Sequence, residues 1–205
     1  MKDTELQEQY AKRKRIISYK ECKVDLEEVL PQIFTAYHDA LNNYNKEIVL
    51  TPPEARCRGL EASLLNSKMI QSIQNIFKDN WFFGKYKRFI VRINGYIILF
   101  KKLNKKGMPM NIPTKFNSSI QNQVQGCLFD AYDNGIDPIV FFGYKKDKFG
   151  EICDPQLVYI DENKVKWTII ERDFKTNNIV SINPQSDGVK LSIRKNGKKD
   201  DGTND

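Results

Sequence analysis

Histidine is nearly absent from this chain, whose only copy is His38. A catalytic dyad or triad built on imidazole would have to use that residue. His38 directly follows Tyr37 and lies off the apolar stripe of a predicted helix, which favours a surface or packing role. The scarcity of histidine therefore argues against histidine-based catalysis and against zinc or iron sites made of histidine and cysteine.

Closely spaced cysteines are also lacking. The four cysteines lie far apart, at Cys22, Cys57, Cys127 and Cys153. No Cys-x-x-Cys pair is available for a zinc knuckle or a dithiol redox site, so we expect ordinary small hydrophobic side chains in a reducing compartment. The sequence predicts no metal and no cofactor.

Long apolar segments and targeting signals are missing as well. The longest apolar runs, such as residues 96–100, are far shorter than a bilayer span, and residues 1–5 lack the pattern of a secretion signal. The glycine-rich phosphate loops, the nucleophile elbow of serine hydrolases and the zinc-protease motif do not occur. We expect a cytoplasmic protein without a membrane association.

Acidic residues are missing from the middle of the chain. None occurs between Asp79 and Asp130, whereas that segment holds nine of the cations. These are Lys85, Lys87, Arg88, Arg92, Lys101, Lys102, Lys105, Lys106 and Lys115. More than the whole net charge of +7 therefore lies in one segment, which favours an anionic partner.

Apolar periodicity predicts an α+β fold. Helical spacing recurs over residues 24–44, with Pro31 as the expected first residue of the main helix, and over residues 60–77 after the helix-start pattern at residues 51–54. A third stretch, residues 120–131, would be capped by Ser118 or Ser119 and end at Asn134-Gly135. We expect two to three N-terminal helices, a β-hairpin and one further helix.

Short strands are expected to follow as a C-terminal antiparallel meander, giving one sheet packed by helices. They are predicted over residues 138–144, 156–160 and 165–170, with weaker signals at 179–182 and 189–193. If Ile160 faces Val165, Val158 and Trp167 share their face. We expect a charged arm or helix over residues 1–23, a single domain over 24–195 and a disordered polar tail over 196–205.

Residues 88–101 predict a β-hairpin, because Asn94-Gly95 supplies the positive φ angles of a two-residue type I′ turn. The register then pairs Ile93 with Tyr96, Val91 with Ile98 and Phe89 with Phe100, which makes one face apolar. The other face would carry Arg88, Arg92 and Lys101 beside Ile90, Ile97 and Leu99. We expect that cationic face to continue into an irregular basic loop over residues 103–116.

The basic hairpin and loop favour a non-enzymatic protein that contacts a polyanion, most plausibly nucleic acid. The residues expected to bind it are Lys85, Lys87, Arg88, Arg92, Lys101, Lys102, Lys105 and Lys106. Aromatic residues interleave with these cations over residues 81–89, as single-strand binders require, although such a run usually packs in a core.

Two other functions stay open. A protein-interaction module of the antitoxin, immunity or inhibitor type would use the same surface for an acidic protein. A metal-free basic ribonuclease would need only positioned cations. A metal-dependent nuclease is less favoured: Asp154 with Glu162 and Lys164 loosely fits its pattern, but Glu162 is expected at a hairpin tip, where it would be a turn residue.

Overall fold

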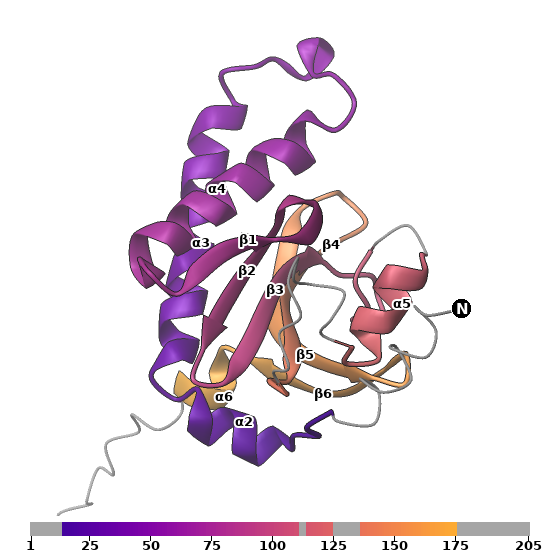
Figure 1. Cartoon of the computed structure of the whole chain (residues 1–205). Helices are drawn as coiled ribbons and strands as arrows, with labels where there is room; N and C mark the ends of the chain where they lie inside the picture. Colours follow the sequence, from indigo (N-terminus) through magenta and orange to yellow (C-terminus); the bar gives the residue numbers. More distant parts are fainter. Residues whose placement is uncertain (1–13, 111–113, 125–135, 176–205) are drawn as a thin grey trace, which may run out of the picture.

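The computed structural model describes residues 14–110, 114–124 and 136–175. In this part of the chain six strands form one sheet whose spatial order follows the sequence (Figure 1). The strands are β1 (Trp81–Gly84), β2 (Arg88–Ile93), β3 (Tyr96–Lys102), β4 (Ile139–Lys146), β5 (Ile152–Asp161) and β6 (Lys164–Ile170). All neighbours pair antiparallel except β3 and β4, which pair in parallel. The predicted α+β class is confirmed.

The helices are α2 (Tyr19–Asp25), α3 (Val29–Ile48), α4 (Leu60–Phe77), α5 (Lys115–Gln121) and α6 (Arg172–Lys175). α3 and α4 lie against one face of the sheet, and their joined ends extend beyond it near the end of β4, where Glu61 pairs with Lys146 (Figure 1). Their apolar stripes meet alternate residues of the strands, such as Val91, Ile98 and Phe142. No helix of the described residues is long and apolar enough to cross a membrane.

Both long helices were predicted, but their starts differ from the expectation. Pro31 is the third residue of α3 instead of the first. Residues 51–54 do not open α4: the chain makes only a 3₁₀ turn over Pro53–Ala55, and α4 begins at Leu60. Gly59 interrupts the helical path with a φ of 91°, a conformation that glycine adopts at no steric cost.

The predicted hairpin is confirmed, with Ile93 paired to Tyr96 and Val91 to Ile98. Its second face differs from the prediction. Ile90, Ile97 and Leu99 are buried there under α5 and the loop that follows β3. We expected this face of the hairpin to form a cationic surface. Instead, its apolar residues belong to a second apolar core.

That second core is closed by α5 and by residues 103–110. Thr114, and not Ser118 or Ser119, caps α5, because its hydroxyl accepts a hydrogen bond from the Asn117 amide. α5 ends at Gln121, and residues 125–135, where the prediction extended it, lie outside the described residues. Ile120 of α5 packs on the sheet.

The predicted meander is confirmed in β4, β5 and β6, with one change of face. Ile160 pairs with Val165 as expected, but a bulge follows Tyr159, so that Trp167 pairs with Tyr159. The two rings stack at a centroid distance of 5.3 Å on the helical side of the sheet. Trp167 therefore does not share a face with Val158. The strands predicted at 179–182 and 189–193 lie outside the described residues.

The described end of the charged N-terminal segment packs on the sheet. Ile17 is buried, and its carbonyl accepts a hydrogen bond from the indole of Trp167 at 3.0 Å. Lys14 forms an ion pair with the buried carboxylate of Asp161 at 2.7 Å. Residues 1–13 and the predicted polar tail, 196–205, lie outside the described residues.

Candidate functional site

The connection between β1 and β2 holds an unfavourable backbone. Tyr86 has φ 59° and ψ 32°, and the next residue, Lys87, has φ 54°. Left-handed backbone costs roughly 1–2 kcal/mol for a residue with a side chain. The turn between β2 and β3 also has positive φ angles, but there the residues are Asn94 and Gly95, which suit this conformation. A tyrosine and a lysine at the first turn are therefore not explained by turn stability.

These turn residues meet the first turn of α5. The rings of Tyr86 and Phe116 lie edge to face with centroids 5.8 Å apart. The ammonium of Lys85 lies 5.8 Å from the centroid of each ring. Tyr86 is 69% exposed and Phe116 is 39% exposed, so both rings remain open to solvent. With the exposed cations Lys87 and Lys115, these residues form what we call the aromatic–lysine cluster: Lys85, Tyr86, Lys87, Lys115 and Phe116.

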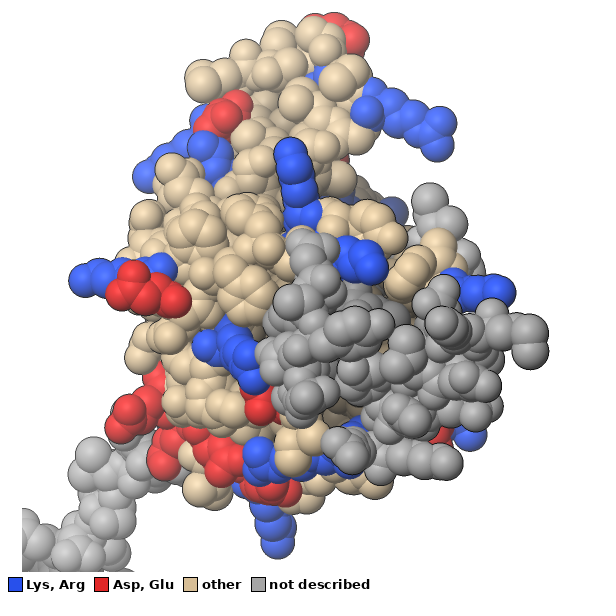
Figure 2. All heavy atoms as spheres, viewed as in Figure 1, with Lys and Arg blue, Asp and Glu red and all other residues tan. Residues whose placement is uncertain are grey.

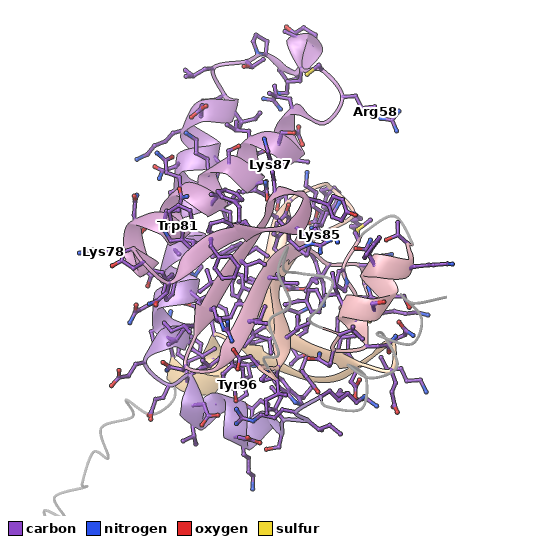
Figure 3. All side chains as sticks on the ribbon, viewed as in Figure 1. Arg58, Lys78, Trp81, Lys85, Lys87 and Tyr96 are labelled. Carbon is purple, nitrogen blue, oxygen red and sulfur yellow. The ribbon has the colours of Figure 1, made fainter. Side chains whose placement is uncertain are left out.

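The cluster carries positive charge, and the described part of the chain places no acid in an ion pair with it. Among the described residues, no carboxylate lies within ion-pair distance of its lysines. Figure 3 shows Lys85 and Lys87 at the turn between β1 and β2, with Trp81 farther along β1. On the same face, Figure 2 shows a broad uncharged surface over β1 and α4. Basic side chains project into solvent beside this surface. Exposed rings and cations are thus combined at one edge of the sheet.

Another exposed lysine–phenylalanine pair provides a contrast. Lys148 lies 4.8 Å from the ring of Phe149, which is 78% exposed, at the turn between β4 and β5. Asp147 and Glu151 flank this pair. The Asp147 carboxylate accepts hydrogen bonds from the backbone amides of Phe149 and Glu151. The acids oppose an approaching polyanion, so the pair lacks the electrostatic character of the aromatic–lysine cluster.

The structure divides the other predicted cations. Arg92, at the far end of β2, forms an ion pair with Asp137 at 2.7 Å. Lys101 lies beside Arg88 on the covered face of the sheet, and burial together with the Arg88 charge lowers the pKa of the Lys101 ammonium. Lys102 is half-buried at the end of β3.

Lys105 and Lys106 occupy the apex of an ordered loop. The side-chain oxygen of Asn104 accepts hydrogen bonds from the backbone amides of Lys106 and Met108. An antiparallel β-bridge joins Leu103 to Pro109. Gly107 lies against β5 and β6: a Cβ atom added to it would lie 3.5 Å from the Val165 side chain. Strands are about 4.8 Å apart, so this apex lies roughly 15 Å across the sheet from β2. The apex and the aromatic–lysine cluster are separate basic sites.

The described part of the chain does not bring together the acids of the nuclease-like sequence pattern. His38 is exposed and lies 3.0 Å from Glu171. Asp154 and Glu162 are at opposite ends of β5, about 25 Å apart along the strand. Glu162 has a φ of 53° at the hairpin tip, as predicted for a turn residue. No group of three or more His, Cys, Asp or Glu in the described ranges could hold a metal ion.

Sequence reasoning did not identify Phe116 as part of the site. It lies in a stretch expected to be an irregular loop, thirty residues after Tyr86, and only the fold brings the two rings together. The adjacent Lys115 was recognised as basic without being assigned to the surface. A phenylalanine directly after a lysine was the available signal in the sequence.

No protein-family model matches the chain, and no curated protein or solved structure is significantly similar to it.

Proposed function

We propose that this protein binds single-stranded nucleic acid through the aromatic–lysine cluster and does not act as an enzyme on it. The observation that carries the proposal is the pair of exposed rings, Tyr86 and Phe116, with the Lys85 ammonium 5.8 Å from each centroid. Unpaired bases stack on exposed aromatic rings, and lysines beside them neutralise the phosphates.

The free energy of base stacking favours a single strand over a duplex as the ligand. Stacking of one base on an aromatic side chain contributes about 1–3 kcal/mol, and bases are available for stacking only when they are unpaired. The three lysines of the cluster would neutralise about three phosphates, which gives a log–log salt slope of roughly −2 on single strands. Such an interface has little sequence preference, because phosphate contacts and stacking do not read base edges.

The test is fluorescence anisotropy with labelled single-stranded DNA and RNA about 12 nucleotides long, and with a duplex of the same length. We expect wild-type protein to bind the single strands and the double variant Tyr86→Ala/Phe116→Ala to bind at least about tenfold more weakly. Phe149→Ala is the matched control, since it removes another exposed ring, the one beside Lys148. Loss of binding in the control alone, or no binding at low salt, would remove the proposal.

A lysine series separates this surface from the predicted loop. Lys85→Ala, Lys87→Ala and Lys115→Ala should each reduce the magnitude of the salt slope by somewhat less than one unit, whereas Lys105→Ala and Lys106→Ala should not change it. The reverse result would move the interface to the loop apex. Intact RNA after incubation without metal is expected; cleavage would instead support a metal-free ribonuclease.

A further inference from the structure

β1 is an edge strand with an open hydrogen-bonding side. Its only neighbour in the described sheet is β2, and the Arg92 amide donates to the Asn80 carbonyl at 2.8 Å where this pairing begins. Backbone groups in an antiparallel strand face its two sides alternately, so this hydrogen bond fixes which residues point to β2. The N–H and C=O groups of Trp81 and Phe83 therefore face away from β2, and in the described part of the chain no further strand lies beside them.

β1 also lacks the features that protect most sheet edges. Proteins shield an exposed edge with lysines, prolines, bulges or a covering segment. The opposite edge strand, β6, carries Lys164 and Lys166 and is contacted by α2. β1 has the sequence Trp-Phe-Phe-Gly, without charge, proline or bulge, and the Phe83 side chain is 49% exposed. An uncharged aromatic edge of this kind is typical of an interface.

We propose that two copies of this chain associate through their β1 strands, which pair antiparallel about a two-fold axis at Phe82. In this register all of the outward backbone groups are paired, because Trp81 of each copy exchanges a pair of hydrogen bonds with Phe83 of the other. The two side chains then share a face of the sheet and extend the ring contacts that Trp81 and Phe83 make with Phe89 within each copy. This inference does not depend on nucleic-acid binding.

The charges at the ends of β1 favour a second copy as the occupant of the edge. By the same register, Asp79 of one copy, just before β1, comes level with Lys85 of the other copy, just after β1. Asp79 is exposed and Lys85 is half-buried. Figure 3 shows Trp81 and Lys85 toward opposite ends of the strand. The two-fold axis repeats the arrangement, so opposite charges meet at both ends of the paired strands.

Sedimentation velocity of the wild-type chain from about 5 μM to about 500 μM measures the association. The strands have four residues, so the interface is small and we expect a dissociation constant on the order of 50 μM. Phe83→Lys removes a facing ring and should weaken the dimer at least about tenfold. Phe149→Lys, the same change at another exposed phenylalanine, should leave it unchanged.

A wild-type chain that stays monomeric over this range would overturn the proposal and leave the edge of β1 to an extended segment of another protein. Equal weakening by Phe83→Lys and Phe149→Lys would overturn it as well, because the dimer would then respond to added charge at any place. Circular dichroism confirms that both variants keep the fold.

A charge exchange tests the register. Asp79→Lys and Lys85→Asp each place like charges at both ends of the paired strands, so each variant alone should dimerise roughly three- to tenfold more weakly than wild type. An equimolar mixture restores opposite charges at both ends and should form heterodimers, which native mass spectrometry distinguishes by mass. Asp39→Lys mixed with Lys148→Asp changes the same charges at exposed positions away from β1 and should show no such gain. An equal gain in both mixtures, or none in the first, would overturn the two-fold register and the proposal with it.

Discussion

The side-chain amide of Gln123 binds the backbone of Ile139 as a neighbouring strand would. Its Oε1 accepts the Ile139 amide at 2.7 Å, and its Nε2 donates to the Ile139 carbonyl at 3.0 Å and to the Ile160 carbonyl at 2.6 Å. Gln123 is buried and has a φ of 66°, so the chain leaves α5 in a strained conformation to reach this position. One side chain thereby joins α5 to β4 and β5.

Gln123→Ala should lower the free energy of unfolding by about 3 kcal/mol, because three buried backbone groups lose their partner and each unsatisfied group costs about 1–3 kcal/mol. Urea unfolding followed by circular dichroism measures the loss. Gln71→Ala, at an exposed position of α4, should change stability by less than about 0.5 kcal/mol. Equal effects of the two substitutions would contradict the bridging role.

Gly143→Ala should destabilise the protein by about 3 kcal/mol or more, or prevent folding. A Cβ at this position would lie 2.1 Å from the Lys101 carbonyl oxygen and 2.7 Å from Cγ of Leu103. Backbone cannot move aside cheaply between paired strands. Gly150→Ala is the control: its Cβ meets no atom within 4 Å, and only its φ of 86° costs about 1 kcal/mol. Thermal and urea unfolding should rank the two variants in that order.

Local patterns predicted those elements whose form depends on neighbouring residues. Asn94-Gly95 determined both the turn and the register of β2 with β3, and apolar spacing located α3 and α4. The parallel pairing of β3 with β4 was not predictable in this way, because it joins residues about forty positions apart through tertiary contacts. The extra residue in β6, Lys166 between Val165 and Trp167, likewise changed the face of Trp167 without any local sequence signal.

The candidate site was predictable in composition and not in geometry. The absence of acids between Asp79 and Asp130 drew attention to this segment. It could not show that Asp137 would pair with Arg92, or that Phe116 would lie on Tyr86. β1 was also missed, because Trp81-Phe82-Phe83 has no alternation of apolar and polar residues to distinguish a strand from a packed loop.

Among the described cysteines, Cys57 should react with iodoacetamide long before Cys22. Cys57 is exposed, whereas Cys22 is buried in the core, and burial raises the pKa of its thiol to about 12. The thiolate is the reactive form, so Cys22 combines poor access with a small reactive fraction. Timed alkylation with peptide mapping should show Cys22 modified only after unfolding in urea. Modification of Cys22 in the native protein would show that α2 opens readily.

Glu61 should contribute to stability at neutral pH and lose that contribution in acid. Its carboxylate lies 3.2 Å from Lys146 and 3.3 Å from Arg56, and the hydrogen bond from Lys146 is the main cause of a lowered Glu61 pKa. A carboxyl group with a lowered folded-state pKa stabilises the fold above its unfolded-state value, and this contribution disappears as pH falls through the folded-state value.

Glu61→Gln should therefore lower the free energy of unfolding at pH 7 by no more than about 1 kcal/mol, since the pair is largely exposed and screened. The difference from wild type should shrink as pH falls below the ordinary value of 4.5. Glu54→Gln, exposed in the 3₁₀ turn, should show no such difference at any pH. A difference for Glu61→Gln that grows in acid would reverse the assigned sign.

Exchanging the turn residues separates folding from binding at the aromatic–lysine cluster. The double variant Tyr86→Asn/Lys87→Gly gives the β1–β2 connection the residues of the β2–β3 turn, which suit positive φ angles. We expect the free energy of unfolding to rise by about 2 kcal/mol, because asparagine and glycine tolerate left-handed backbone better than tyrosine and lysine do. Binding of a single strand should weaken by at least about tenfold, because a stacking ring and a phosphate contact are lost.

The opposite exchange supplies the control. Asn94→Tyr/Gly95→Lys should lower stability, because it places two poorly suited residues in left-handed backbone and removes the hydrogen bond from Asn94 to the Asp25 carbonyl. It adds a ring and a cation at the wrong turn, so affinity for the single strand should not improve beyond the small effect of one added charge. If the first variant were stabilised and still bound with wild-type affinity, Tyr86 and Lys87 would have no role in binding, and their strained backbone would need another explanation.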